Sequence, residues 1–106
     1  MNMSSYSCCK SDKLETRSIS KLSSLLKLVG ESSRLKILCI LHQGEHCVCE
    51  FDKHIELSQS LLSHHLADLR KAGLIMGEKQ GLNVHYQLTE KGKRIVEHIF
   101  NLEVKS

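Results

Sequence analysis

Residues 57–73 read LSQSLLSHHLADLRKAG, and this stretch decides the fold. Its leucines recur at the three- and four-residue spacing of a helix with one apolar face. Ser58 is suited to cap the start of that helix and Gly73 to end it. The polar residues near its front are short or planar groups that can donate and accept hydrogen bonds, as a helix lying in the major groove of DNA requires. The stretch predicts the recognition helix of a helix-turn-helix, with candidate base contacts at Gln59, Ser60, Ser63, His64 and His65.

The segments on either side of this helix predict a winged helix-turn-helix, whereas an amphipathic helix alone also occurs in proteins that never bind DNA. Residues 47–55 predict the short helix that precedes the turn. After Gly73 the apolar period changes to two, which predicts two strands joined by a polar turn over residues 77–81. In the second strand, one face is expected to carry Leu82, Val84, Tyr86 and Leu88. Two strands directly after a recognition helix form a wing.

Three further helices are predicted from apolar residues at helical spacing, over residues 19–29, 34–43 and 91–102. The middle one, opened by Ser32 or Ser33, is apolar nearly all round and is expected at the centre of the domain. The first and last carry more apolar surface than one small domain can bury. We expect them to form a two-fold dimer interface rather than to pack only within the chain, because two recognition helices can then bind two half-sites.

The predicted fold class is therefore mainly α, a winged helix-turn-helix of five helices with a two-stranded antiparallel wing, dimerising through its first and last helices. Residues 18–106 form the predicted DNA-binding and dimerisation domain, and residues 1–17 form a flexible arm that carries Cys8 and Cys9. Proline is absent, as suits a mostly helical chain.

Charge and composition limit the function further. From residue 58 to residue 94 there are six Lys and Arg against three acids, which matches the formal net charge of +3 for the whole chain. This surplus indicates contact with phosphates of double-stranded DNA, for which the candidates are Arg70, Lys79 and Asn83. No apolar run is long enough to span a membrane, and no secretory signal or catalytic set is visible. We expect a cytoplasmic protein that is not an enzyme. Its five cysteines indicate a reducing compartment, where thiols are more often ligands or sensors than disulfides. Cys39, inside an apolar helix, is expected to be a packed thiol.

Four segments carry a resemblance to a known family. They read ESSRLKILCIL at 31–41, GEHCVCE at 44–50, SQSLLSHHLADLRKAGLI at 58–75 and YQLTEKG at 86–92. In this order they resemble the ArsR/SmtB family of metal-responsive winged-helix repressors. The resemblance implies a homodimer that represses its operator DNA until an inducer binds.

The family's metal-binding box, Glu-Leu-Cys-Val-Cys-Asp, corresponds here to residues 45–50, EHCVCE. The resemblance implies that Cys47 and Cys49 bind a thiophilic ion. If Val48 points inward, the two cysteines lie at the first turn of a helix, whose N-terminus favours the thiolate form. His46 is a candidate spare ligand.

Two sulfurs do not complete a site for a soft ion, because tetrahedral sites need four ligands and trigonal As(III) needs three. The resemblance to the cadmium- and lead-sensing branch implies that the N-terminal arm supplies Cys8 and Cys9 to the facing protomer. The third cysteine of the arsenic-sensing members is replaced by Asp52, and the family's other zinc site, which begins Asp-x-His, is replaced by residues 90–92, EKG. The persulfide-sensing branch uses a cysteine in the last helix, and none lies there. The expected inducers are Cd(II), Pb(II), Zn(II), As(III) or Sb(III), with no organic cofactor.

Two alternatives remain on the same scaffold. The cysteines at 8, 9, 47 and 49 can instead serve as a redox or reactive-thiol switch, which would respond to peroxide or persulfide without metal. In the other alternative the domain binds DNA and no ligand changes its affinity.

Overall fold

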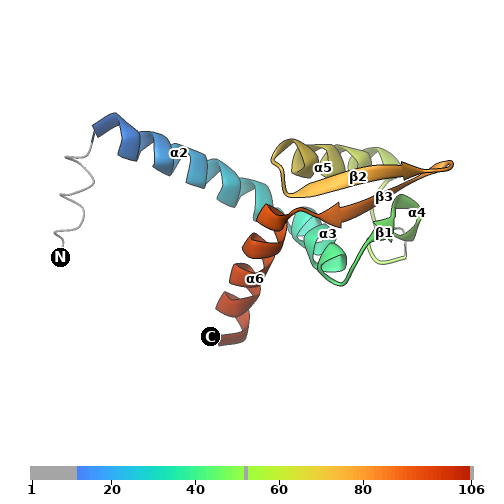
Figure 1. Cartoon of the computed structure of the whole chain (residues 1–106). Helices are drawn as coiled ribbons and strands as arrows, with labels where there is room; N and C mark the ends of the chain where they lie inside the picture. Colours follow the sequence, from blue (N-terminus) through green and yellow to red (C-terminus); the bar gives the residue numbers. More distant parts are fainter. Residues whose placement is uncertain (1–11, 52, 106) are drawn as a thin grey trace.

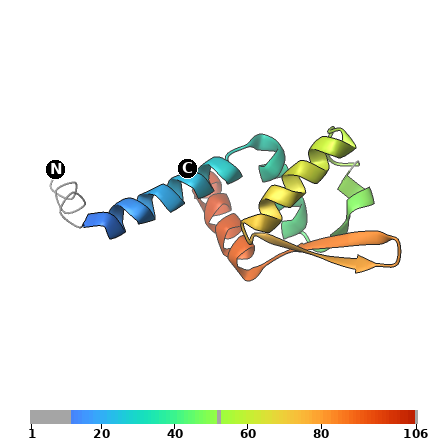
Figure 2. The ribbon, with the colours of Figure 1, turned by 90° about the horizontal axis from the view of Figure 1, so that it is seen from above.

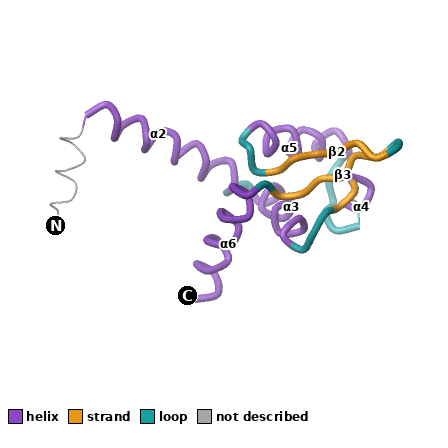
Figure 3. The backbone as a smooth tube through the Cα atoms, viewed as in Figure 1, coloured by secondary structure: helices purple, strands orange, loops and turns teal. Residues whose placement is uncertain are grey.

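The structure, a computed structural model, describes residues 12–51 and 53–105 as a winged helix-turn-helix (Figures 1 and 3). This confirms the predicted mainly helical winged helix-turn-helix, whereas dimerisation through the first and last helices stays a prediction. The elements follow in the order α2 (Asp12–Val29), α3 (Ser32–His42), β1 (His46–Cys47), α4 (Val48–Phe51), α5 (Gln59–Lys71), β2 (Ile75–Gln80), β3 (Asn83–Leu88) and α6 (Glu90–Lys105).

Helix α3 lies at the centre of the body, as its apolar sequence predicts. Ile37 and Leu38 have no exposed surface, and the helix contacts α2, α5, α6 and β3. Its N-cap is Glu31, whose carboxylate accepts a hydrogen bond from the Arg34 backbone N–H at 3.0 Å. The expected capping residues, Ser32 and Ser33, instead lie inside the first turn.

Helix α5 is bounded as expected at both ends. The Ser58 hydroxyl accepts a hydrogen bond from the Leu61 backbone N–H at 3.1 Å, which satisfies a free donor of the first turn. At the other end Gly73 adopts a φ of 81°, and the backbone N–H of Leu74 donates to the Leu69 carbonyl at 3.1 Å. This bond is part of a Schellman motif, in which a left-handed glycine closes the C-terminal end of the helix. The recognition helix therefore has a defined length and a sharp exit into the wing.

The sheet has three strands in the order β1-β3-β2, whereas the sequence predicted two. Strand β1 joins it by pairing His46 with Tyr86 and Cys47 with His85. The short helix predicted over residues 47–55 is reduced to α4, because Cys47 belongs to this strand. Phe51 and Ile55 are nevertheless buried in the core.

The wing is longer than predicted and its turn is shorter. Strand β2 continues to Gln80, which pairs with Asn83, so only two residues remain for the turn and the predicted turn over residues 77–81 is wrong. Gly81 has a φ of 67°, which suits glycine in a tight hairpin turn. Within β2, the Tyr86 ring crosses over Gly77. A Cβ at that position would come within 2.8 Å of the ring, so a glycine is needed there. Leu82 occupies the turn and is 98% exposed, so it does not share the buried face of β3.

The start of helix α6 packs closely against the segment that follows the recognition helix. The Thr89 hydroxyl accepts a hydrogen bond from the Gly92 backbone N–H at 3.1 Å and caps the start of the helix. A Cβ on Gly92 would lie 2.1 Å from the Leu74 carbonyl oxygen, so only glycine permits this approach. The start of α6 is thus held against the exit from α5.

Helix α2 projects from the body (Figures 1 and 2). It begins at Asp12, inside the segment predicted as a flexible arm. Ile19, Leu22 and Leu26 are 55%, 55% and 59% exposed along it. The Cα radius of gyration is 16.6 Å, against about 13 Å for a compact chain of this length. Among the described residues, no helix is both long and apolar enough to cross a bilayer.

Candidate nucleic-acid interface and cysteine pair

The predicted DNA-reading residues divide into an exposed group and one buried residue. Seven of the eight candidates have exposed side chains, as predicted, and they lie on α5 or on the hairpin of the wing: Gln59, Ser60, Ser63, His64, Arg70, Lys79 and Asn83. The structure thus brings two basic side chains and several neutral hydrogen-bonding groups to the surface of the two elements that contact DNA in winged-helix proteins. Their contacts with DNA remain predictions.

His65 is the exception, and its predicted position on the exposed face is wrong. Its side chain is buried, with 6% of the residue exposed. The Arg34 Nε donates a hydrogen bond to its Nδ1 at 3.1 Å, and its Nε2 lies 3.8 Å from the Glu31 carboxylate. The sequence carried no sign of this arrangement, because Arg34 is 31 residues distant along the chain.

Arg34 is the residue that sequence reasoning missed. Besides His65, its guanidinium contacts the Asp68 carboxylate at 2.9 Å and the Leu28 carbonyl at 3.3 Å. Asp68 in turn lies 3.3 Å from the exposed His64 ring, one turn earlier on α5. One side chain at the start of α3 therefore connects the end of α2 to the middle of the recognition helix.

The wing is connected to the segment before β1 by a smaller polar cluster. The Glu45 carboxylate accepts a hydrogen bond from the Gln80 side-chain amide at 3.1 Å and lies 3.3 Å from His85 Nδ1. These contacts join the hairpin to the residues that immediately precede the cysteine pair. Glu45 thus connects the wing to the segment that carries the cysteine pair.

Cys47 and Cys49 are in direct contact, with their sulfurs 2.7 Å apart. Cys47 is 5% exposed, whereas Cys49 is exposed at the surface. The Glu50 carboxylate accepts a hydrogen bond from the Cys47 backbone N–H at 2.7 Å and so closes the tight turn between β1 and α4. Val48 is partly buried and packs against the hydrophobic core, as expected. The expectation that both cysteines lie at the first turn of a helix is wrong, because Cys47 ends strand β1.

The local electrostatics do not favour a free thiolate at Cys49. Its hydrogen bond with Cys47, followed by burial and by the charges of Cys47 and Glu50, raises the pKa of the Cys49 thiol. The predicted lowering by a helix N-terminus is therefore wrong, since α4 has only four residues. Glu50 itself is shifted in the opposite direction, because the hydrogen bond from the Cys47 backbone lowers the pKa of its carboxyl. The thiol form of Cys49 is therefore favoured over its thiolate.

Further ligands are not gathered around the pair within the part of the chain that the structure describes. No group of three or more His, Cys, Asp or Glu side chains suited to a metal ion occurs there. Cys8, Cys9 and Asp52 lie outside the described residues. The His46 Nδ1 lies 2.8 Å from the Gly44 carbonyl oxygen, within hydrogen-bond distance. The two contacting sulfurs suit a soft ion by their chemistry, and such an ion needs further donors.

Cys39 is separate from this pair. It lies on α3, is half-buried, and burial raises the pKa of its thiol. These features agree with the prediction that it is a packed thiol. It offers a natural control for experiments on the other cysteines.

A groove opens beside the exposed cysteine, between α4, the start of α5 and the turn of the wing. Its volume is about 310 Å³. It is lined by Val48, Cys49, Gln59, Leu62, Leu82, Asn83 and Val84. Cys49 and two candidate DNA contacts, Gln59 and Asn83, therefore border the same space.

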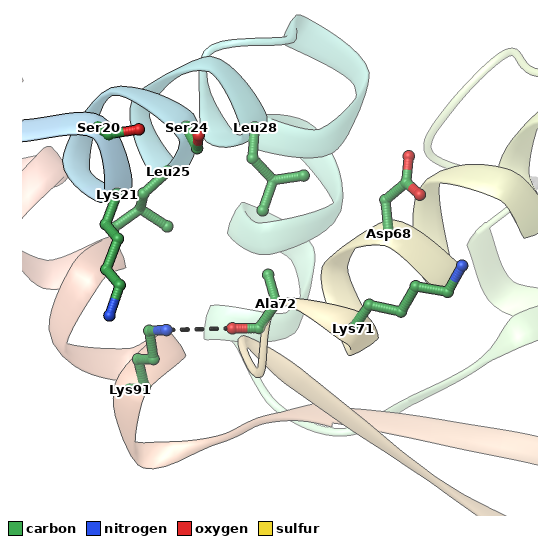
Figure 4. A pocket seen from close by; sticks show the side chains of 9 residues that line it. All are labelled: Ser20, Lys21, Ser24, Leu25, Leu28, Asp68, Lys71, Ala72 and Lys91. Atoms are coloured by element: carbon green, nitrogen blue, oxygen red, sulfur yellow. Dashed lines mark hydrogen bonds between the residues drawn. The ribbon is translucent and has the colours of Figure 1, made fainter. Parts of the chain in front are cut away.

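A second hollow, of about 580 Å³, lies between α2, the end of α5 and the start of α6 (Figure 4). The Lys91 amine donates to the Ala72 carbonyl at 3.1 Å and places a positive charge at the C-terminus of the recognition helix, where the helix dipole favours it. Lys21 and Lys71 also line the hollow. It contains no cysteine and is distinct from the groove beside Cys49.

The fold and the exposed polar face of α5, with Arg70 and Lys79 at the surface, are those of a DNA-binding transcriptional regulator. The family model for bacterial regulatory proteins of the arsR family matches residues 31–76. The arsenical resistance operon repressor of Staphylococcus aureus is 42% identical over 71 residues, which are 67% of this chain and 68% of that protein. The chain belongs to the ArsR family.

Solved structures agree with this assignment. Reduced HlyU from Vibrio cholerae superimposes with a TM-score of 0.73 at 39% identity, over 82% of this chain and 93% of that one. The V. cholerae HlyU protein is a transcriptional activator by name. The homodimeric winged helix-turn-helix domain of Mb0332 from Mycobacterium bovis has a TM-score of 0.76 at 20% identity, over 91% of this chain and 90% of that domain, a likeness of fold alone.

Proposed function

We propose that this protein is a homodimeric repressor that leaves its operator when a thiophilic metal or metalloid ion binds its cysteines. The observation that carries the proposal is the contact between the Cys47 and Cys49 sulfurs, 2.7 Å apart. Both are within reach of one ion, since metal–sulfur bonds are about 2.3 Å long. The pair lies on the segment that leads into the recognition helix, where an ion can influence how DNA is bound.

In the proposed complex, α5 lies in the major groove and the wing lies along the backbone. Gln59, Ser60, Ser63 and His64 read base edges from the exposed face of α5. Arg70, Lys79 and Asn83 contact phosphates. His65 has no direct contact in this proposal, because it is buried against Arg34.

Dimerisation is proposed to use α2 and α6. Ile19, Leu22 and Leu26 form an exposed apolar stripe on α2, and Leu102 is exposed on α6. Exposed leucines gathered on a projecting helix are typical of an interaction surface. The Mb0332 domain, which has the same fold, is a homodimer, and this supports a dimeric state for the present chain.

The inducer is proposed to bind Cys47 and Cys49, with Cys8 and Cys9 of the arm completing the site. Candidate ions are Cd(II), Pb(II), Zn(II), As(III) and Sb(III). The similarity of this chain to the arsenical resistance operon repressor of S. aureus favours the metalloids among them. Binding is proposed to stabilise a dimer spacing that the operator rejects. Coupling free energies of this kind are about 1–3 kcal/mol, enough to release a repressor.

The test is a gel shift with the DNA upstream of the protein's own gene, titrated with arsenite and with Cd(II). We expect release from wild-type protein and from the matched control Cys39→Ser, and loss of release in Cys49→Ser. Ultraviolet thiolate absorption during the same titration counts the bound sulfurs. Unchanged release in both Cys47→Ser and Cys49→Ser would contradict the proposed site.

A redox switch is the second candidate, and the same sulfur contact favours it. Two thiols that touch can be oxidised together, with peroxide as the electron acceptor. This candidate requires release by peroxide in the absence of metal and recovery with a reductant. Release by arsenite under reducing conditions would exclude it as the principal mechanism.

A further inference from the structure

We propose that Leu82, at the tip of the wing, is an apolar wedge that enters the minor groove of the operator and partly unstacks one base step there. The inference rests on the DNA-binding part of the proposed function and does not involve the cysteine pair. It goes beyond the proposed phosphate contacts of the wing, because it gives the tip a part in the choice of DNA sequence.

Leu82 is the most exposed large apolar residue in the part of the chain that the structure describes, at 98%. Single exposed leucines are ordinary on protein surfaces, so its position carries the argument. It is one of the two turn residues of the hairpin, where glycine and short polar residues are preferred. The tip also lies at the end of the molecule opposite α2 (Figures 1 and 2). A second copy bound through α2 and α6 would therefore leave Leu82 uncovered.

The hairpin constrains the position of Leu82. Strands β2 and β3 stay paired as far as Gln80 and Asn83, so only Gly81 and Leu82 lie outside the ladder. The Gln80 side-chain amide donates to the Glu45 carboxylate at 3.1 Å, which connects the end of β2 to the segment before β1. A wedge must keep its place while two base pairs are pushed apart, and a short hairpin held in this way meets that requirement.

The start of the recognition helix and the tip of the wing lie on two sides of the protein groove beside Cys49. Gln59, a proposed base contact in the major groove, lines its α5 side, and Asn83, a proposed phosphate contact, lines its wing side together with Leu82. In DNA a single sugar–phosphate strand separates the major groove from the minor groove. With α5 in the major groove, a strand that passes through the protein groove places the tip at the minor groove. No acidic side chain is among the described residues that line the protein groove, so its walls do not repel the phosphates.

Apolar contact, rather than charge, is the main interaction that this hairpin offers to DNA. Over residues 75–88, Glu78 and Lys79 are the only formally charged residues with histidine neutral, so the hairpin has no net charge. The minor groove is about 6 Å wide, and leucine is among the side chains that minor-groove-binding proteins insert between base pairs. Such insertion bends the duplex toward its major groove, where α5 is proposed to lie.

The wedge selects DNA sequence through the stiffness of the duplex. Unstacking costs less at pyrimidine–purine steps such as TA and CA/TG than in stiff A-tracts. We therefore expect a preference for a flexible step at the position that Leu82 contacts, although no hydrogen bond to a base is made there. This preference lies outside the bases that the polar residues of α5 are proposed to contact.

The experiment uses reduced full-length protein without added metal and the DNA upstream of the protein's own gene. Fluorescence anisotropy measures operator affinity, and 2-aminopurine placed at successive steps of the protected site reports unstacking. We expect Leu82→Ser to weaken operator binding about tenfold, as for the loss of one buried leucine contact, and to abolish the 2-aminopurine signal. Met76→Ser, which removes an exposed apolar side chain elsewhere on the wing, should change neither. The slope of affinity against salt concentration should be unchanged in Leu82→Ser, whereas Lys79→Gln should reduce it by about 1.

A second comparison changes the DNA instead of the protein. Replacing the contacted step by AA should weaken wild-type binding about tenfold and leave the binding of Leu82→Ser unaffected, because the variant no longer opens that step. Wild-type affinity in Leu82→Ser, or unstacking that persists in this variant, would overturn the inference. A change of oligomeric state in analytical ultracentrifugation that accounts for the lost affinity would overturn it as well.

The two hypotheses fail separately. If arsenite or Cd(II) releases the operator but no step is unstacked in the complex, only the inference is wrong. If Leu82 unstacks a step but no ion releases the DNA, the proposed induction is wrong and the wedge stands.

Discussion

Helices α2 and α3 are neighbours in sequence and share a leucine-rich pattern, but they differ in what surrounds them. On α3, Ile37 and Leu38 are completely buried. On α2, Leu22 and Leu26 are more than half exposed, and the helix projects from the body (Figure 2). Helical periodicity is therefore sufficient to form an apolar stripe, while the elements packed around it determine whether the stripe is covered. The body supplies partners for α3, and we propose that a second copy of the chain supplies them for α2.

The largest expected effect separates the two helices by the same substitution. Leu38→Ala should lower the free energy of unfolding by about 2–5 kcal/mol, because it leaves a cavity in the centre of the body. Leu26→Ala, its matched control on α2, should cost much less in dilute protein, since its side chain is largely exposed in one chain. Urea denaturation followed by circular dichroism measures both. Equal losses at low protein concentration would remove the distinction between the helices.

The next effect concerns the proposed partner of α2. Leu22→Ser together with Leu26→Ser should weaken dimerisation by about 1.5–3 kcal/mol for each leucine that is buried in the interface. The body should remain folded, because neither residue belongs to its buried core. Analytical ultracentrifugation over a range of concentrations measures the change. A variant that stays dimeric to the same dilution as wild type would exclude α2 from the interface.

A third prediction concerns Arg34, which connects the end of α2 to the recognition helix. Arg34→Leu should destabilise the fold by about 1.5–3 kcal/mol, because it removes hydrogen bonds to Asp68 and to the Leu28 carbonyl and leaves a carboxylate partly buried. Operator affinity should also fall, since Asp68 and His65 lie on the recognition helix. Arg34→Lys keeps the charge but not the forked geometry, and it should recover only part of the loss. Wild-type DNA affinity in Arg34→Leu would show that this network does not position α5.

The smallest effect is a pH dependence at the junction of α2 and α3. The hydrogen bond from the Arg34 backbone N–H lowers the pKa of Glu31 in the folded protein. The contribution of Glu31 to the free energy of unfolding is therefore present above its unfolded-state pKa. It is lost as the pH falls through the folded-state pKa. Glu31→Gln removes the charge-dependent part of this contribution, so it should lower stability slightly at neutral pH, change it little at acidic pH, and thereby flatten the acid-side decrease. Thermal unfolding from neutral to acidic pH measures it, with Glu90→Gln at another helix start as the control.

Much of the fold could be predicted from local sequence. The leucine spacing and the capping residues Ser58, Gly73 and Thr89 act over three to five residues, so their effects are independent of the rest of the chain. The change of apolar period after the recognition helix likewise predicted the wing. The exposed positions of seven candidate DNA contacts followed from the same local pattern.

Features that depend on contacts between residues far apart in the sequence could not be predicted from local patterns. His65 is buried because Arg34, on another helix, donates to its ring. Cys47 is a strand residue because β1 pairs with β3, whose register places His85 opposite it. These choices depend on the free energy of long-range contacts, which a local pattern does not contain. Local patterns in the chain specify the order and type of most elements and the two cysteines at 47 and 49. The packing of distant segments places Cys49 at the edge of a groove beside Gln59 and Asn83, the proposed DNA contacts.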